Sequence, residues 1–310
     1  MAEGNAVLER LENKIHRKDC LDFMKRLPEK SIDFCMTSPP YWQLRNYGVK
    51  GQVGREKTPE DFIEKLVIIF RELKRVLKDT GSFYLNLGDT YIGPDYCRVK
   101  SWKIQKQLAL IPARVAIAMQ DDGWILRNDI CWIKPNGLPS SVKDRLTCRW
   151  EHIFHFVKQK KYYYDLDAIR EPYKECSIKR VANRMKLQER TGKPMTEKSK
   201  YFSEGKGKYG VSGFLTGRSF TRFLQSKGKN PGDIWEIAIK PFSCPHFAVY
   251  PEELCIRPIK SSCPPKGIVL DMFAGSGTTL VVAKKMGRRF IGCDLNHDYV
   301  RIARKRLKVL

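Results

Sequence analysis

Residues 268–279 read IVLDMFAGSGTT, an apolar strand that ends at Asp271 and then runs through a glycine-rich turn into a helix. Gly275 and Gly277 would let the backbone of this turn approach a ligand closely. The N-terminus of the helix that follows favours an anionic group. This strand–turn–helix unit is typical of the ligand-binding edge of an α/β sheet.

The turn lacks the residues of two common nucleotide sites. It has no GxxxxGK[ST] lysine, which excludes a P-loop, and no GxGxxG, which argues against a nicotinamide dinucleotide. A second strand, RFIGCD at 289–294, ends at Asp294, and an acidic residue at the tip of the next strand can bind ribose hydroxyls. The pattern therefore predicts a nucleoside cofactor with an amino-acid tail in place of phosphates.

A second motif, TSPPYW at 37–42, directly follows the buried strand IDFCM at 32–36. Its two prolines remove backbone donors and leave carbonyl acceptors at the carboxyl end of a strand, where ligands bind in open α/β sheets. The Ser38 hydroxyl, the Pro39 carbonyl and the Tyr41 ring would suit a planar amine. The alternative is an ordinary proline turn that ends a strand.

The rest of the chain alternates between strand-like and helix-like patterns. Further β-rich runs lie at 15–19, 82–87, 124–133 and 152–157. Helical periodicity occurs at 59–78, 108–121, 252–261, 277–287 and 297–308. The alternation predicts a doubly wound α/β fold with a seven-stranded mixed sheet, in which 124–133 and 152–157 form an antiparallel pair at one edge.

Charge indicates the kind of partner. Lysine and arginine total 58 against 34 acidic residues, a net charge of +24, which attracts polyanions such as nucleic acid. Residues 158–229 hold 19 basic and 7 acidic residues, so half of the surplus lies in less than a quarter of the chain. Such a concentrated block favours a binding surface over a general solubility device.

The basic block coincides with an insert at 160–230 that is rich in Lys, Arg, Gly and Ser. Aromatic residues are interleaved with its cations: Tyr162, Tyr163, Tyr164, Tyr173, Tyr201, Phe202, Tyr209, Phe214, Phe220 and Phe223. Cations can meet phosphates while rings stack on bases, so we expect a target-recognition region between a catalytic half at 1–159 and a cofactor-binding half at 231–310. A disordered linker is the alternative, although disordered segments are usually poor in aromatics.

Several classes of protein are disfavoured. No apolar run approaches the roughly 20 residues of a membrane span, and the N-terminus lacks the apolar stretch of a secretory signal. We therefore expect a cytoplasmic protein, associated with the nucleoid through DNA, with reduced cysteines. Cys244, His246, Cys255 and Cys263 lack the tight spacing of a zinc site, so no metal is expected.

TSPPYW and DMFAGSGTT together resemble the motifs of the DNA amino-methyltransferases. Their order, with the insert between them, is similar to that of the β group, whose sheet is circularly permuted. The resemblance covers 15–172 and 231–308. Its other matching stretches are LKDTGSFYLNLGDTY, DICWIKPN, RWEHIFHFVKQKKYYYDLDAIREPY and HFAVYPEELC. It implies S-adenosylmethionine as cofactor and double-stranded DNA as substrate. A cognate restriction endonuclease that forms no stable complex with the chain is a further expectation.

The resemblance assigns cofactor binding to Asp19, Asp271, Phe273, Gly275, Ser276, Gly277, Thr278 and Asp294. Asp271 and Thr278 would face the methionine part, Phe273 would pack on the adenosine, and Asp294 would hold the ribose. The permuted order places the first strand, KIHRKDC, beside the strand that ends at Asp294. Asp19 would then lie near the adenine amino group, unless it simply caps the helix that follows.

Base binding is assigned by resemblance to Ser38, Pro39, Pro40 and Tyr41, with Asp89 of LNLGD as a weaker candidate that could equally be a structural, salt-bridged aspartate. In this family, Ser before Pro-Pro-Tyr favours cytosine N4 and Asp favours adenine N6. We therefore expect N4-cytosine methylation of a flipped base, with N6-adenine as the alternative. No covalent intermediate is expected, since the chain lacks a Pro-Cys pair.

Two other functions stay open. A non-catalytic DNA-binding module on the same fold would have no reason to bind the cofactor. A methyltransferase of RNA or protein is a third reading, although protein-amide methylators have Asn where Ser38 stands. The recognition sequence and the oligomeric state are left open by the sequence.

Overall fold

The computed structural model describes residues 2–93, 104–191, 227–240 and 249–309. The chain forms two compact units. The larger consists of Met1–Asp165 and Gly232–Leu310, and the smaller of Leu166–Pro231. The larger unit contains both motifs, TSPPYW and the glycine turn, so its architecture decides how they meet.

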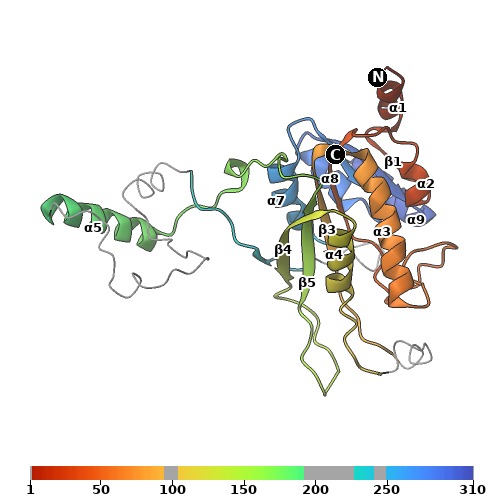
Figure 1. The fold of residues 1–310 in the computed structure, drawn as a ribbon, viewed down its shortest axis with the longest axis horizontal. Coiled ribbons are helices and arrows are strands. Elements are labelled where there is room, and N and C mark those ends of the chain that lie inside the picture. The colour runs from red at the N-terminus through yellow and green to blue at the C-terminus, as the bar shows by residue number, and fades with distance from the viewer. Residues whose placement is uncertain (1, 94–103, 192–226, 241–248, 310) are drawn as a thin grey trace. The chain divides into compact units, whose positions relative to one another are not determined.

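The larger unit is built on one mixed sheet with the strand order β1-β8-β7-β2-β3-β5-β4-β6 (Figure 1). β1, β8, β7, β2 and β3 run parallel, β5 is antiparallel to both β3 and β4, and β6 is parallel to β4. The strands are β1 (Lys14–Arg17), β2 (Ile32–Thr37), β3 (Leu77–Leu87), β4 (Ile125–Ile133), β5 (Trp150–Val157), β6 (Ile234–Glu236), β7 (Ile268–Asp271) and β8 (Arg289–Asp294). The predicted doubly wound α/β class is confirmed.

The strand count differs from the prediction, because the sheet has eight strands among the described residues where seven were expected. The additional strand, β6, has three residues, too few to show an alternating pattern. It pairs with β4, where Cys131 lies opposite Ile234. The antiparallel pair of β4 and β5 therefore exists as expected, but β6 forms the edge of the sheet beyond it.

The first strand of the chain pairs with the last one. β1 lies parallel to β8, with Arg17 opposite Asp294. This is the pairing that the circularly permuted order of the resembling family predicts.

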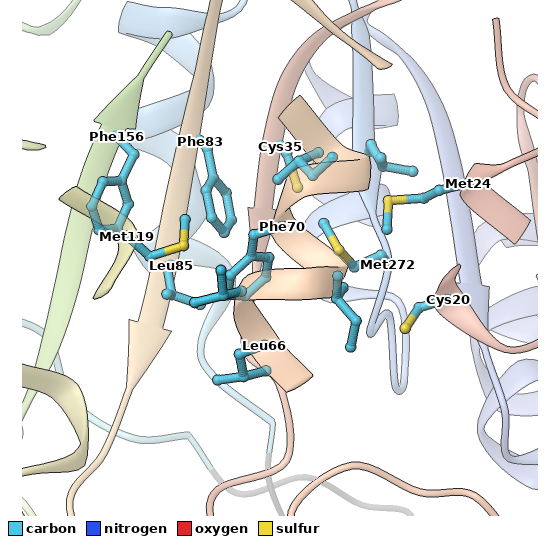
Figure 2. Packing of buried hydrophobic residues seen from close by; sticks show 14 of the residues in the cluster. Cys20, Met24, Cys35, Leu66, Phe70, Phe83, Leu85, Met119, Phe156 and Met272 are labelled. Atoms are coloured by element: carbon cyan, nitrogen blue, oxygen red, sulfur yellow. The ribbon is translucent and has the colours of Figure 1, made fainter. Parts of the chain in front are cut away.

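Helices cover both faces of the sheet (Figure 1). The residues of β2 contribute to two cores, and an irregularity between Ile32 and Phe34 in the pairing with β3 accompanies the change of face between these two residues. Ile32 and Cys35 pack with α2, α3 and α4, whereas Phe34 and Met36 pack with α7, α8 and α9. Figure 2 shows the first core, where Phe70 of α3 lies against Phe83 of β3, with ring centroids 4.9 Å apart. The helices of this unit are α1 (Ala2–Leu11), α2 (Cys20–Met24), α3 (Pro59–Val76), α4 (Ile111–Asp121), α7 (Glu252–Ser262), α8 (Thr278–Lys285) and α9 (His297–Lys308).

Local signals explain where the long helices begin. The Thr58 hydroxyl accepts the backbone N–H of Asp61, and Pro59 occupies the first turn of α3. The Asn296 side chain caps α9 in the same way through the N–H groups of Asp298 and Tyr299. α1 was not expected, because the N-terminal sequence was interpreted as a polar and charged stretch.

The smaller unit contains a 3-10 turn, Asp167–Ile169, and α5 (Glu175–Thr191). Glu171 and Lys229 form a β-bridge and an ion pair of 3.0 Å, which closes the ends of the unit. Of the aromatics noted in the insert, Tyr162 and Tyr164 belong to the larger unit, where both rings lie against His155 of β5. The aromatics at 201–223 lie outside the described residues.

No helix among the described residues is long and apolar enough to cross a membrane. The same residues contain no group of three or more His, Cys, Asp or Glu arranged to hold a metal ion. Cys255 and Cys263 are buried free thiols, whereas Cys244 and His246 of the suggested metal set lie outside the described residues.

Candidate active site

The two motifs meet because β2 and β7 are parallel neighbours, with Cys35 opposite Leu270. Both strands therefore end at the same edge of the sheet. There the Thr37 hydroxyl donates to Asp271 Oδ1 at 2.6 Å, and the backbone N–H of Phe273 donates to Thr37 Oγ1 at 3.2 Å. TSPPYW and the glycine turn are thus tied together at their first residues.

Asp271 is the centre of this junction. Its side chain is buried and also accepts the backbone N–H of Phe273 at 3.2 Å and the Tyr250 hydroxyl at 3.4 Å. Burial raises the pKa of Asp271 to about 6, and the hydrogen bond from Thr37 opposes the rise. Asp271 thus supports the start of the glycine turn, and it is absent from the described walls of the two cavities beside that turn.

Asp271 predicts a pH dependence of stability. Since its pKa rises from 3.8 in the unfolded chain to about 6 in the folded one, the folded state retains a proton that the unfolded state has lost between these values. The free energy of unfolding should therefore fall as pH rises from about 4 to about 6. Asp271→Asn should remove about 2–3 kcal/mol of this fall in urea unfolding series. If the free energy of unfolding of Asp271→Asn fell with pH as steeply as that of the wild type, the raised pKa of Asp271 would be contradicted.

Two charged side chains, Asp294 and Arg306, hold the glycine turn in place. Asp294 at the end of β8 accepts the N–H of Gly275 at 2.8 Å through one oxygen and the N–H of Asn296 at 2.8 Å through the other. Arg306 of α9 donates to the Ser276 carbonyl at 2.9 Å and to the Thr278 hydroxyl at 3.0 Å. These contacts fix the turn before any ligand binds.

The two glycines of the turn have different tasks. Gly275 (φ +50°) borders both cavities, as a close approach to a ligand requires. Gly277 (φ +79°) borders neither, and a Cβ at this position would lie 2.9 Å from Cβ of Ala303 in α9. Gly277 therefore serves the packing of α9 on the turn, and the expected approach to a ligand does not explain it.

Gly277→Ala should lower the free energy of unfolding by about 2–4 kcal/mol, the sum of a left-handed backbone and an overpacked contact. Gly287 is a matched control, because it also has a positive φ (+66°) but has open space around its Cβ direction. Gly287→Ala should cost only about 1–2 kcal/mol, the backbone share alone. Equal losses in urea unfolding would contradict a role for the contact with Ala303.

A cavity opens in front of the turn and encloses about 720 Å³, part of it open to solvent. Its wall contains carboxylates at Asp19 and Asp294 and aromatic rings at Phe273, Tyr47 and Tyr299. Rings can hold a nucleobase, and carboxylates suit ribose hydroxyls and a positively charged group. The chemistry of the wall therefore fits S-adenosylmethionine. The segment at 47–53, which supplies five residues of the wall, was not singled out from the sequence, although its glycines hint at a turn.

Two predicted aspartates cap helices. Asp19 accepts the N–H groups of Leu21 (2.9 Å) and Asp22 at the start of α2, so the capping alternative holds, and Asp19 borders the cavity as well. Asp89 accepts the N–H of Thr90 at 2.8 Å and of Ile111 at 3.0 Å, at the start of α4. Burial raises the pKa of Asp89, yet the described walls of the two cavities do not include it.

Residues 38–41 of TSPPYW form a ledge between the first cavity and a second, larger cleft of about 1380 Å³. Ser38, Pro39 and Tyr41 border it, whereas Pro40 faces the first cavity. Four residues border both spaces: Ser38, Tyr47, Phe273 and Gly275. A planar group on the ledge would therefore adjoin a ligand of the first cavity.

A polar network stands behind the ledge. The Tyr41 hydroxyl donates to Glu151 Oε2 at 2.7 Å, and Ser38 Oγ donates to Tyr41 Oη at 3.4 Å. The Asn86 amide donates to Glu151 at 3.1 Å, and Lys134 forms an ion pair with the same carboxylate. Burial, and then the charge of Glu151, raises the pKa of Tyr41 well above its ordinary value, so its hydroxyl stays protonated.

The sequence did not single out Asn86, Lys134 or Glu151, because only strand register brings them together. Asn86 lies opposite Ile153 in the pairing of β3 with β5. Glu151 lies opposite Trp132 in the pairing of β5 with β4. Side chains two residues apart share a face of a sheet, so Asn86, Glu151 and Lys134 converge on one face.

The chain is similar to known DNA methyltransferases in sequence and in fold. A family model described as DNA methylase, of the N6/N4 methyltransferase type, matches residues 32–305. The chain is 37% identical to the type II methyltransferase M.XycI of Xanthomonas campestris pv. cyanopsidis, over 94% of this chain and 86% of that protein. It is 33% identical to the type II methyltransferase M.SfiI of Streptomyces fimbriatus, over 91% and 88%.

Solved structures share the fold. The cytosine-N4-specific PvuII DNA methyltransferase superposes with a TM-score of 0.64 at 19% identity, covering 94% of this chain and 85% of that one. The M1.HpyAVI–SAM complex superposes with a TM-score of 0.56 at 17% identity, covering 95% and 98%.

Proposed function

The chain belongs to the N6/N4 DNA methylase family, and from this premise we propose that it methylates the exocyclic N4 amine of cytosine in DNA. Family membership makes the protein a type II DNA methyltransferase with S-adenosylmethionine as cofactor. The choice of cytosine and the role of each site residue are the proposed part.

The cofactor would occupy the first cavity. Asp294 would hold its ribose, Phe273 and Tyr47 would pack on its adenosine, and Gly275 would let the turn approach its methionine part. Asp19 caps α2 through Oδ1, so its Oδ2 would face the adenine edge. When bound there, S-adenosylmethionine supplies a methyl group attached to a positively charged sulfur.

The observation that carries the proposal is the shared wall of the two cavities at Ser38 and Phe273. A base that lies on the ledge would present its edge at the boundary with the cofactor cavity. Orientation of this kind can contribute about 7–11 kcal/mol to a barrier. Such an edge is inaccessible inside a duplex, so the target base would flip out onto Tyr41.

The residues of the ledge would act on the amine. Its lone pair is delocalised into the ring, which makes it a poor nucleophile. Ser38 Oγ and the Pro39 carbonyl would accept its two protons in hydrogen bonds and so help to localise the lone pair on nitrogen. The Tyr41 ring would stack on the base, and the proton would leave after transfer, when the methylated amine is acidic.

Ser38 also supports cytosine over adenine, because the resemblance associates Ser at this position with cytosine N4 and Asp with adenine N6. The unit Leu166–Pro231 would read the DNA sequence, in keeping with the basic surplus of that region. A restriction endonuclease that recognises the same sequence would be its functional counterpart, without a stable complex.

Expression in a methylation-deficient bacterial host tests the proposal. Single-molecule sequencing of the host's genomic DNA would report both the modified base and its sequence context. We expect N4-methylcytosine at one recurrent sequence, and a much smaller modified fraction at that sequence with Ser38→Ala. N6-methyladenine at that sequence would overturn the assignment to cytosine, and an unmodified genome would overturn activity on DNA.

A further inference from the structure

Three donors converge on the carboxylate of Glu151: Asn86 of β3, Lys134 directly after β4, and Tyr41 in the loop that follows β2. Tyr41 reaches Oε2 at 2.7 Å, Asn86 reaches the same oxygen at 3.1 Å, and Lys134 pairs with Oε1. The side chains of Glu151 and Lys134 are 17% and 19% exposed, so water competes little for these bonds. A charged group held this firmly controls the direction in which its neighbours donate.

Tyr41 has a single proton to donate and two acceptors within reach. Asn86 Oδ1 lies at 3.2 Å and is neutral, whereas Glu151 Oε2 lies at 2.7 Å and is charged. Hydrogen bonds to an ionised acceptor are shorter and roughly twice as strong, so the proton points to Glu151. The Tyr41 oxygen is then left as an acceptor for the Ser38 hydroxyl at 3.4 Å.

We propose that Glu151 is a positioning residue that fixes the direction of this hydrogen-bond chain and thereby makes Ser38 an acceptor toward the cleft. Because the proton of Ser38 is directed to Tyr41, the lone pairs of Ser38 Oγ face an incoming base. The ledge then selects a base with an exocyclic amine over one with a carbonyl at the same place, such as uracil or thymine. The inference rests on the proposed function, since it concerns the base on that ledge.

Asn86 also presents a hydrogen-bond acceptor to the cleft. Its amide nitrogen donates to Glu151 and, at 3.1 Å, to the backbone carbonyl of His152. Both amide protons are thereby used, and Asn86 presents its oxygen toward Tyr41 and the cleft that it borders. A carbonyl on the base would meet acceptors at this wall, and a site built for an N–H group rejects an analogue that lacks it, because buried polar groups stay unpaired.

Glu151→Gln tests the direction of the chain at nearly constant volume. The amide can turn its NH2 group to Tyr41, which frees the Tyr41 proton for Ser38 and allows Ser38 to donate to the cleft. We expect single-turnover methylation to fall about 10- to 100-fold, as for a small misplacement of reacting groups. The binding preference for duplexes with cytosine over uracil at the target position should fall as well, with unchanged affinity for S-adenosylmethionine.

A double-mutant cycle with Tyr41→Phe separates this role from a purely structural one. If Glu151 acts through the Tyr41 hydroxyl, adding Glu151→Gln to Tyr41→Phe should change neither the rate nor the preference further. In Glu151→Gln alone, Lys134 keeps a buried charge without its partner, which should lower stability in urea unfolding. Lys134→Met combined with Glu151→Gln removes both charges and shows whether this unpaired lysine accounts for any loss of activity. Asp79→Asn is the matched control, because Asp79 pairs with Lys30 and Lys158 at the other end of β3.

The outcomes distinguish the two proposals. Suppose that the wild-type protein methylates cytosine. If Glu151→Gln then keeps the wild-type base preference, or if the effects of Glu151→Gln and Tyr41→Phe multiply, the role of Glu151 is overturned and the proposed function stays intact. A wild-type protein that methylates no amine in DNA would overturn the function, and the inference with it.

Discussion

Asp294→Ala is expected to weaken the binding of S-adenosylmethionine about 100-fold. Its carboxylate does two things at once: it holds the turn through the N–H groups of Gly275 and Asn296, and it borders the cofactor cavity. A hydrogen bond to a charged group contributes about 1.5–3 kcal/mol, so the loss of the ribose contact and of the support for Gly275 adds to about this factor. Isothermal titration calorimetry would measure the change.

Asp298→Asn is the control for this substitution. Asp298 lies in the first turn of α9, four residues beyond Asp294, and its exposed carboxylate pairs with Arg301 at 3.4 Å. Its replacement should leave cofactor affinity unchanged. If Asp294→Ala bound the cofactor as tightly as Asp298→Asn, the ribose site would have to lie elsewhere.

Gly88→Ala is expected to reduce methyl transfer about 100-fold while the protein stays folded. A Cβ at this position would lie 2.6 Å from Cε2 of the Tyr41 ring, so the ring must move. Displacement of about 1 Å in a group that orients the substrate can cost about 10²-fold in rate. The loss should appear in single-turnover kinetics with saturating cofactor and DNA.

The matched control is Gly4→Ala in α1, where the added Cβ would meet Pro28 at an ordinary 3.6 Å. This variant should transfer methyl groups at the wild-type rate. Cofactor affinity should stay unchanged in Gly88→Ala, because Gly88 does not border the described cofactor cavity. A wild-type rate in Gly88→Ala would show that the position of the Tyr41 ring is unimportant.

The fold could be predicted from sequence wherever a short stretch of residues indicates a particular strand, turn or helix. The run IVLD followed by a glycine turn marks β7 and α8, and the permuted order that the family resemblance implies places β1 beside β8. β6 was missed because three residues carry no periodicity, and α1 because its charged and polar residues hide the short apolar set of Val7, Leu8 and Leu11 that packs on the core.

The site was predictable only as far as its motifs reach. Ser38, Tyr41 and Asp294 could be proposed because they stand in motifs that end or follow strands, and the structure places all three in the walls of the two cavities. Glu151 was not found, since its partners Asn86 and Lys134 come from other strands and meet it only through register. Gly277 shows the converse limit, because a glycine in a motif looks the same whether it faces a ligand or, as here, Ala303.

Nucleoside mass spectrometry would show directly which base the protein methylates. Purified protein would be incubated with S-adenosylmethionine and unmethylated DNA of diverse sequence, and the DNA digested to nucleosides, with Ser38→Ala and Asp79→Asn in parallel. The account predicts N4-methylcytosine from the wild type and from Asp79→Asn, and about 100-fold less from Ser38→Ala. N6-methyladenine in its place, or no methylated base at all, would contradict it.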